Sequence, residues 1–207
     1  MKFIDFFVKR LDSIMELTWE HLLMVLVAMA ISIIIGVLVG ILITLNEKAA
    51  KIVLSIAEVL MTIPSLALFA VLIPIFHIGA TPAIIGLVLY TQLPIVRNVY
   101  TGIKNISPSI IESARGMGMS DFKIMYKIKL PLAFSVLIAG VRTAVVMGVG
   151  MGAIASYVGA GGLGDYIFQG IQRTNDKMVL IGAIMISLMA IAMDRLLLFI
   201  QRKVEVK

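Results

Sequence analysis

Five stretches of the sequence are apolar over a length that can cross a lipid bilayer, which takes about 20 mostly apolar residues in a helix. They run over residues 22–45, 52–75, 83–103, 132–158 and 178–200. Hydrophobic residues make up 60% of the chain and charged residues 14%, against roughly 45–50% and about 25% in a typical soluble domain. The sequence therefore predicts an all-α, polytopic membrane protein with five transmembrane helices.

The length and the residue types limit what else the chain can contain. At 207 residues it suits one transmembrane domain over residues 1–207, with no room for a second folded unit beside the spans. It has no cysteine, which excludes disulfides and thiolate metal sites. The formal net charge is +6, but the basic residues cluster beside apolar stretches, as in proteins that face anionic lipid, so we expect membrane lipid and no nucleic acid as a partner.

The first 20 residues have a different pattern from the spans. Apolar side chains alternate there with acidic and basic ones at near-helical spacing, which predicts a short amphipathic helix on the membrane surface over residues 1–20. The first span is too long and too late for a signal peptide, so we expect it to remain in the mature protein.

Lysine and arginine predict the orientation, because cytoplasmic flanks collect these residues. With the amino terminus outside, 12 of the 18 flank the cytoplasmic side, five flank the outer side, and Arg142 lies within a span. This bias predicts an external amino terminus, a cytoplasmic carboxyl terminus and a cytoplasmic loop over residues 104–131.

That loop carries helix signals of its own. Ser107-Pro108 places proline at a first helical position, and Ser109-x-x-Glu112 has the pattern of a capping box. Glycines follow that can end the helix. We therefore expect a short helix, a tight turn and a second short helix before the fourth span.

The first of these helices has an apolar face, and the second is expected over residues 121–129 with Ser120 as its cap. The side chains of the face follow at spacings of three and four: Ile110, Ile111, Ala114 and Met117. A helix about 15 Å long is marginal alone and needs a partner for such a face. Periodicity leaves open whether the partner is another protein, the protein's own spans or lipid.

The same loop contains a spaced motif: Glu-Ser-Ala, three residues, glycine, nine residues, then Ile-x-Leu-Pro. The residues are Glu112, Ser113, Ala114, Gly118, Ile128, Leu130 and Pro131. The motif resembles the E-A-A-x3-G-x9-I-x-L-P signature of bacterial ATP-binding-cassette importer permeases, and departs from it at Ser113. The resemblance implies that the loop docks an ATPase subunit in the cytoplasm.

Two further segments, residues 139–144 and 156–164, narrow the resemblance. With the loop, they are similar to the permease subunits of osmoprotectant importers, which carry glycine betaine, carnitine and choline, and more loosely to the methionine importer permease. The resemblance covers about residues 19–201. It implies a chain in the bacterial inner or plasma membrane that forms the translocation path as a dimer, either of two copies or with a related sibling.

The resemblance also implies which partners complete the importer. They are two cytoplasmic ATPase subunits, which bind the ATP, and an extracytoplasmic binding protein, which we expect to be separate because this chain ends at Lys207. The permease itself is then expected to need no cofactor. Alternating access would follow when the ATPases close on nucleotide and move the docking helices.

A glycine cluster follows the fourth span, at Gly159, Gly161, Gly162 and Gly164. It is not a phosphate-binding loop, because no Gly-Lys-Ser/Thr follows and the predicted topology places it outside the cell. The glycines predict a sharp turn, which the resemblance places near the binding protein. A merely flexible turn is the alternative.

Arg142 lies about 16 Å into the fourth span, where a charge is normally paired or hydrated. Glu58 lies about 9 Å into the second span from the same side, and we predict that the two form a pair. The alternatives are that Arg142 lines the translocation path or is satisfied by backbone carbonyls. A cationic substrate would be repelled by a free arginine, which favours a paired or off-path Arg142.

Proline and aromatic residues within the spans give weaker indications of a translocation path. Pro64 and Pro94 mark places where spans can bend around a path. Tyr90, Tyr157 and Phe69 could offer ring faces to a quaternary ammonium group, although aromatic residues in spans more often serve packing or lie at the membrane interface.

No catalytic or metal-binding constellation is visible in the sequence. His21 and His77 are far apart and do not make a metal site. Because no catalytic grouping appears, we expect no enzyme activity in this chain. A methionine-type permease, or a small membrane enzyme or assembly factor, are the alternatives to an osmoprotectant permease.

Overall fold

The computed structural model describes residues 3–204, and within that range it contains helices and no strands. The elements in chain order are α1 (Phe3–Val8), α2 (Leu11–Ile43), α3 (Glu47–Thr62), α4 (Ser65–Phe76), α5 (Ala80–Lys104), α6 (Pro108–Gly116), α7 (Asp121–Ile124), the π-helical turn η1 (Met125–Lys129), α8 (Leu130–Ala155), the 3-10 turn η2 (Ser156–Val158), α9 (Leu163–Gln172) and α10 (Asp176–Val204). The predicted all-α class is confirmed.

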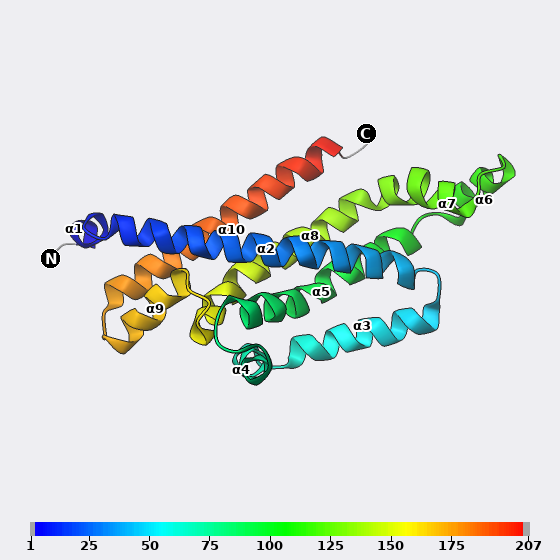
Figure 1. Cartoon of the computed structure of the whole chain (residues 1–207). Coiled ribbons are helices and arrows are strands. Elements are labelled where there is room, and N and C mark those ends of the chain that lie inside the picture. Colours follow the sequence, from blue (N-terminus) through cyan, green and yellow to red (C-terminus); the bar gives the residue numbers. More distant parts are fainter. Residues whose placement is uncertain (1–2, 205–207) are drawn as a thin grey trace.

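Four long helices, α2, α5, α8 and α10, run along an elongated molecule (Figure 1). Among the described residues, four helical segments are long and apolar enough to cross a membrane: Leu11–Ile43, Ala80–Lys104, Asp121–Val158 and Asp176–Lys203. α1 and α9 lie at one end of the molecule, and α6 and α7 lie at the other (Figure 1). The first, third, fourth and fifth predicted spans all fall on these helices.

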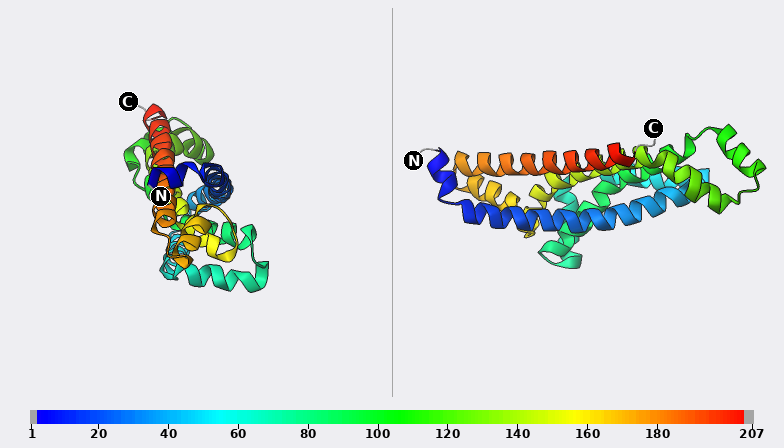
Figure 2. Two further views of the ribbon diagram at one scale, coloured as in Figure 1. Left: turned by 90° about the vertical axis from the view of Figure 1, so that its left-hand side faces the viewer. Right: turned by 90° about the horizontal axis from the view of Figure 1, so that it is seen from above.

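The second predicted span, residues 52–75, is divided between α3 and α4, which meet at an angle of 99°. Proline disfavours the helical conformation of the residue before it, and Ile63, which precedes Pro64, is extended with φ −66° and ψ 128°. The Tyr90 hydroxyl of α5 donates a hydrogen bond to the Ile63 carbonyl that the break exposes. As a result, α4 projects crosswise from the bundle (Figure 2). α5, by contrast, is continuous through Pro94.

The amino-terminal segment also differs from its prediction. The predicted surface helix over residues 1–20 is reduced to α1, and α2 begins at Leu11, because no glycine or proline interrupts the helix before the first span. Phe6 anchors α1 against Ile14, Tyr166 and Met178. Met1 and Lys2 lie outside the described residues.

Small residues let α2, α5 and α8 approach closely. A Cβ atom on Gly40 of α2 would lie 2.6 Å from Val99, and one on Gly140 of α8 would lie 2.6 Å from the Pro94 carbonyl oxygen of α5. Membrane helices associate through such close packing because lipid supplies little hydrophobic drive between them. Ser32 and Thr91, both fully buried, add a hydrogen bond of 2.5 Å between α2 and α5.

Candidate functional site

The predicted two-helix loop is present at one end of the molecule (Figure 1), and we call residues 108–129 the α6–α7 module. α6 begins at Pro108 with Ser107 as its N-cap residue. This agrees with the first of the two predicted start signals, Ser107-Pro108. The alternative capping box is wrong, because Ser109 lies inside the helix and its hydroxyl is 2.8 Å from that of Ser107.

The turn after α6 depends on a left-handed glycine. Gly118 has φ +78°, and its N–H donates to the Arg115 carbonyl at 2.9 Å. The Ser120 hydroxyl accepts from the Lys123 N–H at 3.4 Å, as its predicted capping role requires. An ion pair of 2.9 Å between Arg115 and Asp121 joins α6 to α7 across the turn.

The second predicted helix of the loop, residues 121–129, is not separate from the fourth span. α7 passes through the π-helical turn η1 into α8, so that Asp121–Val158 forms one helical segment of 38 residues. Pro131 stands inside this continuous segment, directly after the π-helical hydrogen bond from the Leu130 N–H to the Met125 carbonyl oxygen. The α6–α7 turn is therefore joined by continuous helix to the span that carries Arg142.

The predicted apolar face of α6 is divided between two environments. Ala114 is buried and Ile111 is half-buried, whereas Ile110 and Met117 are 42% and 74% exposed. The remaining motif residues vary likewise: Glu112, Ser113, Gly118 and Pro131 are exposed, and Ile128 and Leu130 are half-buried.

Phe122 and Tyr126 add to the exposed apolar surface of the module, at 81% and 67% exposure. Sequence reasoning missed them, although their spacing of four residues puts them on one helical face. Large aromatic side chains exposed on so small a module are typical of a surface that a partner covers.

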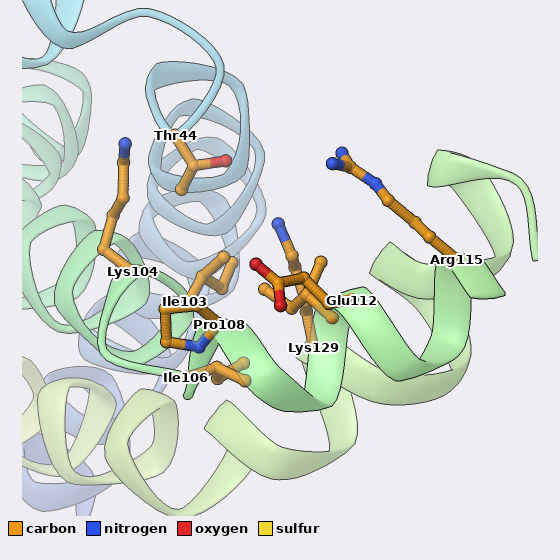
Figure 3. Close-up of a pocket in the computed structure, with 9 residues that line it drawn as sticks. Thr44, Ile103, Lys104, Ile106, Pro108, Glu112, Arg115 and Lys129 are labelled. Carbon is orange, nitrogen blue, oxygen red and sulfur yellow. The ribbon is translucent and has the colours of Figure 1, made fainter.

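A pocket of about 260 Å³ separates α6 from the ends of the long helices. Its lining includes Ile111 and Glu112 from α6, Thr44 after α2, Lys104 from α5 and Lys129 before α8. In Figure 3, Glu112 points into this space. α6 packs on α7, and the module is joined to the bundle through its chain connections, at residues 105–107 and through η1 into α8.

The glycine cluster lies at the opposite end of the molecule from the α6–α7 module (Figure 1). Gly159, Gly161 and Gly162 have φ of 80°, 74° and 81°, so the sharp turn that the sequence predicts is present. Gly164 is required for close packing and not for a left-handed backbone, because a Cβ there would lie 2.1 Å from the Ala153 carbonyl oxygen.

Two residues of α2 hold this turn in place. The Glu20 carboxylate accepts a hydrogen bond of 3.1 Å from the Gly162 N–H. The fully buried His21 ring lies beside Gly162, and its Nε2 atom is 3.0 Å from the Val149 carbonyl oxygen. Burial, followed by the charge of Glu20, raises the pKa of the nearby Asp165 carboxyl.

The charged residues within the spans do not pair as predicted. Arg142 donates to both carboxylate oxygens of Asp194 in α10, at 2.9 and 3.1 Å, and Glu58 forms an ion pair with Arg97 of α5. The predicted Arg142–Glu58 pair is therefore wrong. α3 packs on α5 and α8 packs on α10, so each charge meets the neighbouring helix. Sequence reasoning missed Asp194, although an acid inside an apolar span was itself a signal.

The three aromatic residues singled out by the sequence are in different places. Tyr90 is buried with its hydroxyl on Ile63, and Phe69 is buried against Gly86. Tyr157 is 67% exposed beside the Phe168 ring, with centroids 5.5 Å apart. They form no common cage. Within residues 3–204 no group of three potential metal ligands occurs.

The chain matches known proteins along most of its length. Residues 32–206 match the family described as "Binding-protein-dependent transport system inner membrane component". The carnitine transport permease protein OpuCB of Listeria monocytogenes is 38% identical over 191 residues, which are 92% of this chain and 88% of that protein. The osmoprotectant import permease protein OsmW of Salmonella typhimurium is 41% identical over 202 residues, 95% of this chain and 94% of that protein.

A solved structure of the MetNI methionine ABC transporter, described as inward facing, has a similar fold. The TM-score is 0.82 at 27% identity, with 91% of this chain and 94% of that chain covered. The chain therefore belongs to the family of binding-protein-dependent transport system inner membrane components, as a membrane-spanning permease of an ATP-binding-cassette importer.

Proposed function

We propose that this permease imports quaternary-amine osmoprotectants, of the class of glycine betaine, carnitine and choline. The observation that carries this proposal is the similarity to permeases named for those compounds, at 38% identity for Bacillus subtilis OpuCB and 41% for OsmW, over 92% and 95% of this chain. A methionine-type importer is the second candidate, because the MetNI permease shares the fold at a TM-score of 0.82.

The α6–α7 module is the proposed docking site for an ATPase subunit. The exposed Ile110, Met117, Phe122 and Tyr126 supply apolar surface, and the helical continuity of α7 with α8 supplies a stiff connection to the membrane. ATP is then bound and hydrolysed in the partner subunit, and this chain carries out no hydrolysis itself.

The complete importer is proposed to contain two permease chains, two ATPases and a binding protein at the glycine turn. Residues 3–204 of one chain contain four or five candidate spanning segments, too few to enclose a path alone. The positive charge bias supports an orientation in the inner or plasma membrane with the α6–α7 module in the cytoplasm. ATPase closure would move the two modules and switch the path between outward and inward access.

Purification and uptake together test this function. The chain is purified in mild detergent with its co-purifying subunits identified, and vesicles are assayed for uptake of labelled glycine betaine, carnitine, choline and methionine. We expect an ATPase to co-purify, and ATP-dependent uptake of at least one quaternary amine. Methionine uptake without any quaternary amine would overturn the substrate class, and a stable chain without an ATPase would overturn the coupling role.

A further inference from the structure

An extended polar network lies between α8 and α10, within two membrane-spanning helices. Arg142 binds Asp194 through two hydrogen bonds and Gln201 Oε1 through a third, of 3.0 Å. Gln201 in turn donates to the Ser135 hydroxyl and carbonyl oxygens, at 3.0 and 3.2 Å. Arg142 lies 12 residues into α8, or about 18 Å along the helix axis, so the ion pair is about midway along this helix.

The ion pair is not sealed between the helices. The Arg142 and Asp194 side chains are 23% and 28% exposed. They line an open pocket of about 400 Å³ with Ala139, Thr143, Val146 and Met147. A second pocket of about 290 Å³ reaches Asp194 from the side of Val146 and Ala190.

This openness is difficult to explain by a purely structural role. An ion pair that only joins two membrane helices is strongest when protein covers it, because water and lipid headgroups then do not compete for its charges. Charged residues within spans pair with one another or face the bundle interior or a water-filled cavity, and they mark the paths of ligands or ions. The pocket volume is also within the roughly 300–1,000 Å³ of small-molecule sites.

We propose that the Arg142–Asp194 pair is a binding site within the membrane for a zwitterionic substrate, an inference that rests on the proposed function. A trimethylammonium carboxylate has a negative group that can face Arg142 and a positive group that can face Asp194. Its carboxylate lies against Arg142 and its quaternary nitrogen against Asp194, antiparallel to the ion pair, which stays formed. Val146 and Met147 provide apolar surface for the methyl groups.

In this arrangement the positive charge of Arg142 does not repel a cationic group. Asp194 cancels the Arg142 charge when the site is empty, so the site does not repel the trimethylammonium group. A cation that lacks a carboxylate, such as choline, gains only the Asp194 contact. The site should therefore distinguish glycine betaine from choline.

Ligand-induced stabilisation of the permease complex tests the site directly. The full chain with its co-purifying subunits, without binding protein, is titrated with glycine betaine or choline while its thermal unfolding midpoint is measured. A site ligand raises the midpoint with saturation, whereas a general osmolyte effect grows without saturation. We expect saturation with glycine betaine, and choline weaker by about tenfold or more, because one charge-assisted contact is lost.

Matched variants separate this site from other ion pairs. Arg142→Gln/Asp194→Asn keeps hydrogen-bonding groups but removes both charges, and should lose the saturable part of the shift. Arg97→Gln/Glu58→Gln changes a different ion pair, between α3 and α5, and should behave as the parent does. If the first variant does not fold, Thr143→Leu serves instead, since it fills the pocket while the Thr143 hydroxyl bonds only within its own helix.

Two outcomes overturn the inference: an absence of saturable stabilisation in the parent, or the same saturable shift in both the Arg142→Gln/Asp194→Asn and Thr143→Leu proteins. Uptake by the complete importer is measured in parallel. Normal glycine betaine uptake without a saturable shift removes this site and leaves the proposed function standing. Uptake of no quaternary amine overturns the proposed function itself.

Discussion

At the residue scale, Gly118 controls the angle between α6 and α7. Its φ of +78° is in the left-handed region, and a Cβ atom there would meet nothing within 4 Å, so backbone strain is the only local obstacle to a side chain. Gly116, two residues earlier, is equally open and ends α6 with ordinary helical geometry. A substitution of Gly116 is therefore a suitable control for the same substitution of Gly118.

Gly118→Val should cost about 1–2 kcal/mol locally and change the turn. We expect near-normal expression and membrane insertion, a several-fold loss of ATPase co-purification, and uptake close to zero. Gly116→Val should retain both activities, because its backbone accepts a side chain. Parent-level ATPase binding and uptake by the Gly118→Val protein would show that the turn does not couple the subunits.

Asp165 should make stability depend on pH. Burial, and then the Glu20 charge, raise its pKa above the ordinary value of 3.8. The folded protein therefore holds this proton more tightly than the unfolded chain does, and ionised Asp165 reduces stability at neutral pH. This cost is relieved as the pH falls through the raised pKa toward 3.8.

Asp165→Asn should accordingly raise the thermal unfolding midpoint at neutral pH, and the gain over the parent should shrink on acidification. The measurement compares the two proteins in detergent across the acidic range. Asp12→Asn, at an exposed position in the first turn of α2, is the control and should not reproduce the gain. A gain independent of pH would show that ionisation of Asp165 is not its cause.

At the element scale, the crosswise α4 is anchored by the Phe69 ring in a notch at Gly86 of α5. A Cβ on Gly86 would lie 2.4 Å from the ring. Gly86→Ala should therefore displace α4 and reduce the free energy of unfolding by about 1–3 kcal/mol, as overpacking typically does.

Denaturant titration and hydrogen exchange across residues 65–76 check this prediction. Phe69→Leu combined with Gly86→Ala should recover part of the loss, since the smaller side chain vacates the notch. Gly150→Ala is the matched control, because nothing lies within 4 Å of its Cβ position. Equal losses from Gly86→Ala and Gly150→Ala would contradict the anchoring role.

The Arg142–Asp194 pair should also couple α8 to α10 energetically. Arg142→Ala leaves the Asp194 carboxylate without its partner, so the double variant with Asp194→Ala should be less destabilised than the sum of the single variants. We expect a coupling of about 1 kcal/mol or more, as for residues in direct contact. Arg142→Ala with Glu58→Ala should be additive, since Glu58 pairs with Arg97. A vanishing Arg142–Asp194 coupling in unfolding titrations would contradict this.

At the scale of the whole molecule, the two ends of the bundle differ in character. α1, α9 and the glycine turn gather at one end, and α10 runs from that end toward the end with the α6–α7 module (Figures 1 and 2). The charge bias along the sequence predicts that the α6–α7 end is cytoplasmic.

An epitope after Lys207 should therefore be protected from protease in intact cells, and one before Met1 should be accessible once the outer barrier is opened. Lysis should expose the first epitope, which serves as the control. Cleavage of the carboxyl-terminal tag in intact cells would reverse the orientation, and the proposed ATPase site would then be on the wrong side.

The sequence alone determined the features that depend on neighbouring residues in the chain. Apolar length identified the long helices α2, α5, α8 and α10, Pro108 and Ser120 indicated where short helices begin, and Gly118 indicated the turn, because each signal depends on local features of the chain. The loop motif with its Gly118 spacing similarly led to the importer family.

Only the tertiary structure decided which distant residues meet. Two charges at similar depths can pair only if their helices are neighbours, and α8 lies against α10, so Arg142 pairs with Asp194 and Glu58 with Arg97. Likewise, Pro64 indicated a bend but not its 99° angle or its direction, which follow from Phe69 in the Gly86 notch and Tyr90 on the Ile63 carbonyl. Helix neighbours are set by packing between segments far apart in the chain, and no local pattern encodes that packing.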